Sequence, residues 1–202
     1  SVLEEAGVIV ADTIAEFQSF VTGAMMLGDK RIGGNRAVLM SNAGFESVIM
    51  SDSIGDGKDR LKLSVYSDET RRRIGEAFSA LGIDKIQDIR NPLDTTPVAN
   101  DAAFAEAARA ILEDPGVDCA VFSPLPMTGA LQTLVPGEAH KENIHDPSSI
   151  GQRLIALSKS TDKPFIVNLD AGPDYDPLTA MLEEAGIPVF RDCDAAVKFL
   201  RR

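Results

Sequence analysis

The sequence of 202 residues predicts an α/β fold, in which a mainly parallel sheet lies between two layers of helices. Short apolar segments, such as residues 37–40, 119–122 and 164–169, alternate with longer segments whose apolar residues recur at helical spacing. The apolar segments are almost unbroken, which is typical of strands buried on both faces of a parallel sheet. A flavodoxin-like three-layer α/β/α sandwich with about five strands is the simplest architecture that accommodates them.

Residues 1–35 are expected to form a lead-in helix and linker that pack on the rest of the chain. Within them, residues 8–10 are apolar and predict a short strand, and Asp12 or Thr13 is suited to cap the helix that follows. Residues 36–202 then form a single globular flavodoxin-like domain. Because the chain opens with Ser rather than Met, we expect it to be a piece excised from a longer protein.

Within residues 36–202 strands alternate with helices, and polar capping residues or a first-turn Pro mark the helix starts. Strands are expected at residues 37–40, 61–63, 86–89, 119–122, 164–169 and 188–190. Helices are expected to begin at or next to Gly44, Ser67, Asn100 or Asp101, Ser148 or Ser149, Pro177, and Asp194. Glycine, alone or after Pro, ends most of these helices because it readily adopts the backbone conformation of a helix terminus.

Two longer segments are expected to be loops. Residues 90–97 are predicted to form an irregular, shaped loop, because their two prolines lack an N–H donor and force the preceding residues to be extended. Residues 124–142 mix Pro, Gly and charged residues, with one helical turn predicted at 129–134. The second loop is long enough to be functional or mobile.

Composition excludes several classes of function. The net charge of −11 and the pI of about 4.6 argue against nucleic acid or an anionic membrane surface as a partner. Cys119 and Cys193 are far apart in the sequence, so neither a disulfide framework nor a cysteine zinc site is indicated, and a reducing cytoplasm is the expected location. No stretch approaches the length of a membrane span.

The strand, turn and helix predicted over residues 36–52 are the most informative stretch. The turn, Ser41 to Gly44, lacks both the nucleoside-triphosphate loop pattern and the dinucleotide-binding pattern. It does place small residues at a helix N-terminus, which favours an anion-binding site there. A plain strand-to-helix turn without a ligand is an interpretation that the sequence supports about equally well. Glu46, in the first turn of the helix, would repel an incoming phosphate.

Other polar clusters have ordinary structural explanations. Residues 91–96 place an amide, a carboxylate and two hydroxyls in one loop, where a self-capping Asx-turn is the favoured interpretation. Two groups of metal-capable side chains are interpreted as solvated or capping residues rather than metal sites: Glu138, His140, Glu142, His145 and Asp146, and Asp170, Asp174 and Asp176. Because no nucleophile motif or acid/base pair is visible, the chain is interpreted as a binding domain without its own catalytic centre.

Four segments in a fixed order carry a resemblance to a known family. They are residues 37–44 with the helix after them, 91–96, 112–121, and 185–191 with 195–197. In this order and spacing, the chain resembles the NDP-forming (ADP-forming) acyl-CoA synthetases, or acetate–CoA ligases, over essentially its whole length. The part that it resembles is their flavodoxin-like domain, which is related to the C-terminal domain of the succinyl-CoA synthetase β chain.

The resemblance implies an enzyme that interconverts acyl-CoA, ADP and phosphate with carboxylate, CoA and ATP, by way of an acyl phosphate and a phosphorylated histidine. It further implies that the helix starting at Gly44 stabilises the phosphohistidine through its N-terminal dipole. The residues implied are Asn42, Ala43, Gly44 and Phe45 at the phosphohistidine, with Asn91, Asp94 and Thr95 in a supporting loop. Where many members have a further glycine, this chain has Phe45 followed by Glu46.

The same resemblance places the catalytic histidine and the ATP-grasp domain outside this chain, so the chain alone is expected to hold no catalytic residue and no cofactor. The full-length enzyme would use CoA, ATP or ADP, and Mg. The implied partners are neighbouring CoA-binding, phosphohistidine and ATP-grasp domains, and the full-length protein is compatible with a homodimer. The competing interpretation is a non-catalytic flavodoxin-like binding or docking module.

Overall fold

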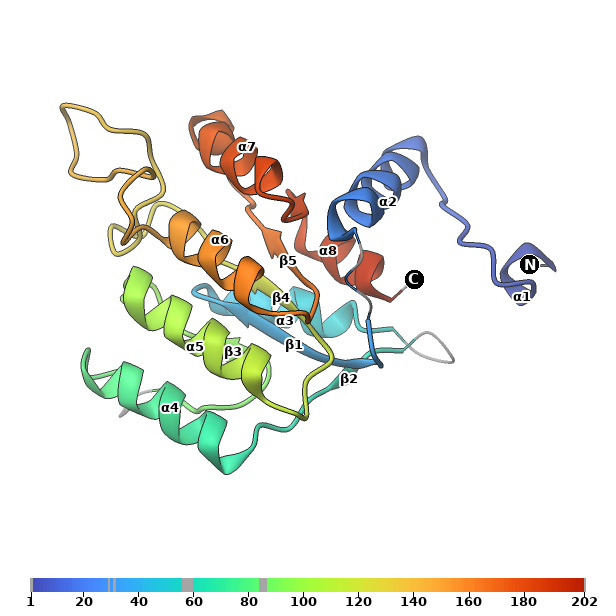
Figure 1. The fold of residues 1–202 in the computed structure, drawn as a ribbon, viewed down its shortest axis with the longest axis horizontal. Helices are drawn as coiled ribbons and strands as arrows, with labels where there is room; N and C mark the ends of the chain where they lie inside the picture. The colour runs from blue at the N-terminus through green and yellow to red at the C-terminus, as the bar shows by residue number, and fades with distance from the viewer. Residues whose placement is uncertain (1, 29, 31, 56–59, 84–86, 202) are drawn as a thin grey trace.

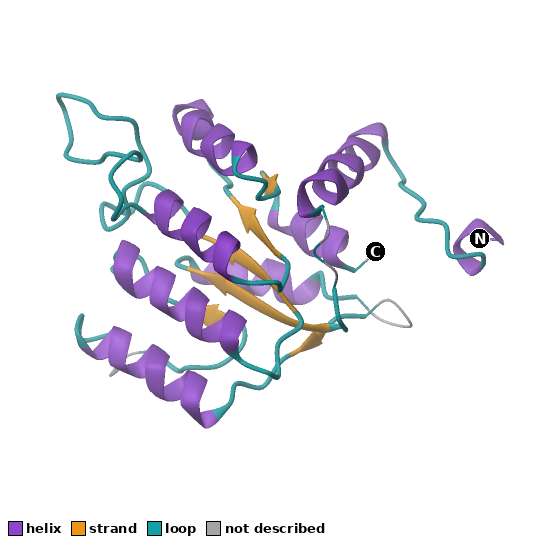
Figure 2. Cartoon of the chain, viewed as in Figure 1, coloured by secondary structure: helices purple, strands orange, loops and turns teal. Residues whose placement is uncertain are grey.

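The structure, a computed structural model, describes residues 2–28, 30, 32–55, 60–83 and 87–201. Six strands form one sheet in which every pairing is parallel (Figures 1 and 2). The strands are β1 (Arg36–Ser41), β2 (Lys62–Leu63), β3 (Leu93–Asp94), β4 (Cys119–Ser123), β5 (Phe165–Asn168) and β6 (Val189–Phe190). The helices are α1 (Val2–Glu5), α2 (Ile14–Leu27), α3 (Gly44–Asp52), α4 (Asp68–Ser79), α5 (Asp101–Glu113), α6 (Ile150–Ser160), the 3₁₀ helix η2 (Pro173–Tyr175), α7 (Asp176–Glu184) and α8 (Cys193–Leu200).

The strand order is β2-β1-β4-β5-β6, and β3 also pairs with β1. Strand β2 lies beside Arg36 and Ala37 at the start of β1, whereas β3 lies beside Met40 and Ser41 at its end. Strands β2 and β3 both pair with β1, so two short strands occupy the same edge of the sheet. The arrangement confirms the predicted flavodoxin-like α/β fold with a parallel sheet.

Side chains cap the helices largely as the sequence predicts. Thr13, Ser67, Asn100 and Ser149 each accept a hydrogen bond from a backbone N–H in the first turn of α2, α4, α5 and α6. The last helix starts one residue earlier than expected, because the carboxylate of Asp192 caps it. These local hydrogen bonds explain why the helix starts could be read from the sequence.

Three predictions of local structure were wrong. Residues 8–10 form no strand and are largely exposed, since no strand among the described residues pairs with them. Residues 129–134 are bends and irregular backbone rather than a helical turn, and Gly129 has a φ of 68°, which a right-handed helix does not allow. Of the strand predicted at 86–89, residues 87–89 are irregular and residue 86 lies outside the described residues.

The loop predicted to be irregular at residues 90–97 instead contains strand β3. Leu93 is fully buried, and the backbone N–H of Thr95 donates to the carbonyl oxygen of Ser41 at 2.8 Å. Leu93 and Asp94 lie between the two prolines and can pair with β1, because β1 is already part of a buried sheet.

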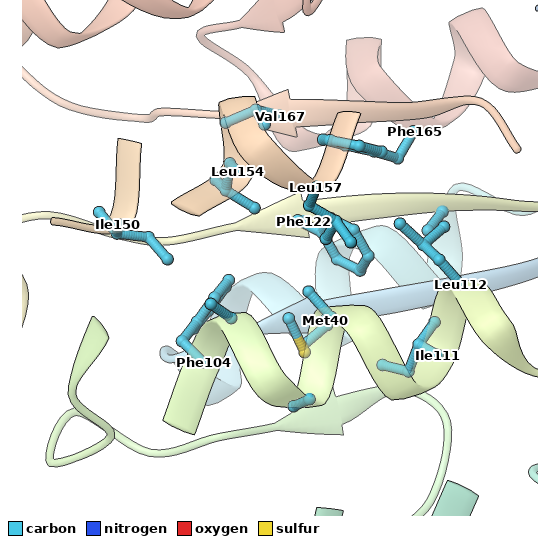
Figure 3. Packing of buried hydrophobic residues seen from close by; sticks show 14 of the residues in the cluster. Met40, Phe104, Ile111, Leu112, Phe122, Ile150, Leu154, Leu157, Phe165 and Val167 are labelled. Carbon is cyan, nitrogen blue, oxygen red and sulfur yellow. The ribbon is translucent and has the colours of Figure 1, made fainter. Parts of the chain in front are cut away.

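Alternate side chains of the strands face the two helical layers. Val38 and Met40 face α4, α5, α6 and α7, whereas Ala37 and Leu39 face α2, α3 and α8. In Figure 1 the helices α4, α5 and α6 lie side by side over one face of the sheet, with α3 on the other. Figure 3 shows the larger core, where Phe122 lies between the sheet and the apolar side chains of α5 and α6.

Helix α2 contacts the second layer through α8. The rings of Phe20 and Phe199 have centroids 6.0 Å apart. Gly23 lies so close to Phe199 that an added Cβ would stand 2.8 Å from the ring atom Cζ. The close approach of α2 to α8 therefore depends on a residue without a side chain at this position.

Candidate functional site

The candidate site lies where β1, β4 and β5 end. Strand β1 leads into α3 on one face of the sheet, whereas β4 leads toward α6 on the other face. The two strands pair directly, with Ser41 opposite Ser123. In open α/β sheets such a switch point leaves a crevice at the carboxyl ends of the strands, where ligands usually bind. The strand predicted within residues 36–52 therefore ends at this crevice, and the turn and helix that follow it begin there.

The start of α3 leaves two backbone donors unused by the helix. The N–H of Ala43 donates to the hydroxyl oxygen of Ser41 at 3.0 Å, and the N–H groups of Glu46 and Ser47 donate to the carbonyl oxygen of Ala43. The N–H groups of Gly44 and Phe45 precede the first intrahelical bond, and the N-cap residue Ala43 offers no side-chain acceptor. Together with the helix dipole, these donors can stabilise an anion.

Phe45 and Asn42 differ in how accessible they are. Phe45, at the helix start, is 56% exposed, whereas Asn42 is fully buried. The Asn42 amide donates to the carbonyl oxygen of Leu125 at 3.0 Å and accepts from its N–H at 2.7 Å. Asn42 therefore joins the β1–α3 turn to the loop after β4, and both ends of its amide group are occupied.

The residues of the predicted supporting loop lie in two different places. Asp94 reaches the start of α3: its Oδ2 is 2.9 Å from the position that a Cβ on Gly44 would take, and its Oδ1 accepts from the N–H of Thr96 at 2.8 Å. Thr95 is buried and bonded to Ser41. A glycine at residue 44 is thus what allows the Asp94 carboxylate to stand beside the helix N-terminus.

Asn91 lies away from the start of α3 and completes the edge of the sheet. Its amide nitrogen donates to the carbonyl oxygens of Ala37 and Ser64 at 2.8 and 3.2 Å, and its Oδ1 accepts from the N–H of Leu39 at 3.0 Å. These contacts fill the gap between β2 and β3 along β1. Its position indicates a structural role that sequence reasoning did not identify.

Glu46 is turned into the protein rather than toward the crevice, and its side chain is fully buried. The Ser41 hydroxyl donates to Glu46 Oε2 at 2.5 Å, and the Asn168 amide donates to Oε1 at 3.2 Å. Asn168 also donates to Ser123 Oγ at 2.9 Å. Burial raises the pKa of the Glu46 carboxyl, the hydrogen bond from Ser41 and the nearby hydroxyl of Ser123 oppose this rise, and the nearby charge of Asp170 adds to it.

Ser123 and Asn168 belong to the site and were not singled out from the sequence. Each is the last residue of an otherwise apolar strand, and both are fully buried. A polar residue at the carboxyl end of a buried strand is the signal that could have identified them.

Two loops that touch the β1–α3 turn contain strained backbone. Thr96 and Met127 have φ values of 65° and 68°, a region that residues other than glycine rarely adopt. Thr96 follows the residue bonded to Ser41, and Met127 lies two residues after Leu125. Strain of this kind concentrates at functional sites and persists only where surrounding contacts hold it, as the Ser41 and Asn42 bonds do here.

The other polar clusters are held by structural contacts. Glu142 accepts hydrogen bonds from the backbone and hydroxyl of Thr133, Asp146 accepts from Ser148, and Asp176 forms an ion pair with Arg191. Within the described ranges, no group of three or more His, Cys, Asp or Glu side chains is placed to hold a metal ion.

A groove of about 670 Å³ lies elsewhere, between α2 and the β6–α8 segment, and none of its lining residues belongs to the candidate site. Among the helices of the described chain, none is both long enough and apolar enough to cross a membrane.

No family model matches the chain. The α subunit of the ADP-forming acetate–CoA ligase II of Pyrococcus furiosus is 26% identical over 189 residues, which is 93% of this chain and 36% of that protein. A solved protein of Pyrococcus horikoshii OT3 is 24% identical, with a TM-score of 0.76 over 98% of this chain and 41% of that one. The dinucleotide-forming acetyl-coenzyme A synthetase 1 of Ca. Korarchaeum cryptofilum, solved with phosphate and ADP, is 17% identical, with a TM-score of 0.75 over 98% of this chain and 38% of that one.

The two solved structures show that the fold is shared. The chain spans 36% of the length of the curated relative and about two fifths of each solved chain. The sequence match to the Pyrococcus furiosus subunit runs through nearly the whole chain, including the candidate site. The resemblance of this chain to the ADP-forming acyl-CoA synthetases, which its sequence motifs indicated, is thereby confirmed.

Proposed function

We propose that this chain is one domain of an ADP-forming acyl-CoA synthetase, an enzyme that converts acyl-CoA, ADP and phosphate into carboxylate, CoA and ATP through a phosphohistidine. The proposal is supported by the similarity to an acetate–CoA ligase subunit over 93% of the chain. The histidine, and the sites for CoA, nucleotide and Mg, are assigned to neighbouring domains. His140 and His145 lie in the loop after β4, and neither has a role in the proposal.

The observation that carries the proposal is the pair of backbone amides at the start of α3, those of Gly44 and Phe45, that precede its first intrahelical hydrogen bond. A phosphoryl group on a histidine is anionic, and the N–H groups of Gly44 and Phe45 can donate to its oxygens at the positive end of the helix dipole. Asn42 holds the turn in place through Leu125. The domain thus supplies a preorganised helix terminus, and its partner supplies the reacting group.

The Asp94 carboxylate weakens the binding of an anion at the start of α3. Its carboxylate stands beside Gly44, so an arriving phosphoryl group meets one negative charge as well as two donors. We assign to Asp94 the function of limiting how tightly the phosphohistidine is held, so that the group can leave for the next step. Replacing Asp94 by Asn is expected to tighten anion binding at α3.

The test uses the full-length protein. It is expected to form ATP from ADP and phosphate when a small acyl-CoA such as acetyl-CoA is supplied, and to form none when the acyl-CoA is omitted. The 202-residue chain alone should be inactive in the same assay. Failure of the full-length protein with every small acyl-CoA would contradict the proposal and favour the non-catalytic docking module.

A further inference from the structure

The Glu46 carboxyl is a titratable group enclosed by neutral hydrogen-bond partners. Its side chain is fully buried, and its partners are the hydroxyl of Ser41 and the amide of Asn168. In the described part of the chain, no Lys, Arg or His forms an ion pair with it. A buried carboxylate without a cation is costly, and protonation is the usual way in which that cost is relieved.

The titratable groups that face Glu46 from the neighbouring elements do not compensate its charge. Asp170, just after β5, is negative and raises the pKa of Glu46. Cys193, at the start of α8, is buried, and burial together with Glu46 and Asp192 raises its pKa to about 11, so it stays neutral. Strands β1 and β4 contribute only the hydroxyls of Ser41 and Ser123, and on the β3 side Asp94 stands against Gly44. The surroundings are therefore neutral or negative.

One hydroxyl group connects Glu46 to the start of α3. Ser41 Oγ accepts from the N–H of Ala43 at 3.0 Å and donates to Glu46 at 2.5 Å. If Glu46 is protonated, its O–H can donate to Ser41 Oγ, and the hydrogen bond reverses. On the other carboxylate oxygen, Glu46 Oε1 accepts from the Asn168 amide, which also donates to Ser123 Oγ, so Ser41 is the partner that can exchange its role with a protonated Glu46.

We propose that Glu46 is a proton-linked positioning residue for the anion site at the start of α3. Anion binding at the Gly44 and Phe45 amides favours protonation of its carboxylate, and loss of the anion favours its ionisation. This inference rests on the proposed function only in assigning an anion to α3. By linkage, a protonated Glu46 and a bound anion favour each other equally.

The sign follows from the charges. Ionised Glu46 lies in the first turn of the helix and repels a bound anion, whereas neutral Glu46 does not, so that the helix dipole stabilises the anion alone. Anion binding should therefore strengthen as pH falls through the pKa of Glu46, and weaken as pH rises through it. Asp94, which touches the same site, is the alternative source of such a dependence and needs its own variant.

The first measurement reads the charge of Glu46 without any ligand. In the 202-residue chain, the Glu46 carboxyl carbon and the amide resonances of Gly44 and Phe45 are followed by NMR from acid to neutral pH. We expect all three to titrate together, with a midpoint above 4.5, the ordinary value for glutamate. The amide titration should vanish in Glu46→Gln and persist in Asp94→Asn. Amides that titrate unchanged in Glu46→Gln would overturn the inference.

The second measurement adds inorganic sulfate, which stays doubly charged over the working range. Sulfate should bind the wild-type chain about fivefold more tightly at low than at neutral pH, the size expected for one charge at a helix terminus. Glu46→Gln should bind it with one affinity at both pH values. The carboxyl-carbon titration of the wild type keeps the test valid if that variant does not fold.

The outcomes separate the two proposals. Sulfate that binds at α3 with the same affinity at both pH values, or that does not bind there, would overturn the role of Glu46. A full-length protein that makes ATP would still support the synthetase in that case. Conversely, proton-linked sulfate binding in a protein that makes no ATP would support the role of Glu46 and contradict the synthetase.

Discussion

Replacing Asn91 by Ala tests whether this side chain, rather than backbone pairing alone, holds the broken edge of the sheet. Asn91→Ala removes three hydrogen bonds, to Ala37, Ser64 and Leu39. The carbonyl oxygen of Ala37 keeps a second donor in the N–H of Ser64, but the N–H of the fully buried Leu39 loses its acceptor. One net hydrogen bond and one buried unpaired donor together cost about 3 kcal/mol of unfolding free energy.

The assay is denaturant unfolding of the 202-residue chain, read by circular dichroism. Asn35→Ala is the matched control, because Asn35 makes one exposed hydrogen bond, to the carbonyl oxygen of Arg60, just before β1 begins. This control should cost less than about 0.5 kcal/mol, as surface substitutions usually do. If Asn91→Ala is no more destabilising than Asn35→Ala, Asn91 does not hold the edge of the sheet and our account of its position is wrong.

Three further predictions concern the site and the packing around it. Because folding raises the pKa of Glu46, its ionisation destabilises the folded wild type, and Glu46→Gln should gain stability relative to wild type as the pH rises above 4.5. The difference in unfolding free energy should grow by at most about 1.4 kcal/mol per pH unit and become constant above the folded-state pKa. A difference that is constant over the whole range would contradict this. Gly44→Ala should displace the Asp94 carboxylate and cost about 1 kcal/mol in a denaturation experiment, whereas in an Asp94→Ala background it should cost nothing; equal costs in both backgrounds would show that the two residues do not interact. Gly23→Ala should destabilise the chain by about 2 kcal/mol despite the better helix propensity of Ala, because its Cβ would meet the Phe199 ring, and an unchanged or higher melting temperature would refute that packing.

The fold was predictable where local chemistry decides it. Thr13 and Ser67 cap their helices through bonds that span three residues, so the sequence contains both partners side by side. Strand β3 was missed because it is two residues long and exists only through pairing with the end of β1, which no local pattern reveals. Residues 8–10 are apolar, yet no strand in the described part of the chain pairs with them.

The candidate site was predictable in place but not in detail. The turn at residues 41–44 was identified because a strand, a small-residue turn and a helix follow one another in the sequence. The inward direction of Glu46 could not be predicted, because its partner Asn168 is 122 residues away. Asn91 likewise acts through backbone groups more than 25 residues distant along the chain.

The most direct test of the central claim places a negative charge at the start of α3 in the full-length protein. Phe45 and Val48 are both exposed on this helix, at 56% and 61%, so Phe45→Asp and Val48→Asp add the same charge one turn apart without disturbing the core. If α3 faces a phosphohistidine, Phe45→Asp should lower the amount of phosphohistidine formed at least about tenfold, and Val48→Asp should change it little, because the dipole acts within the first turn. Equal phosphohistidine formation in the two variants and the wild type would contradict the account.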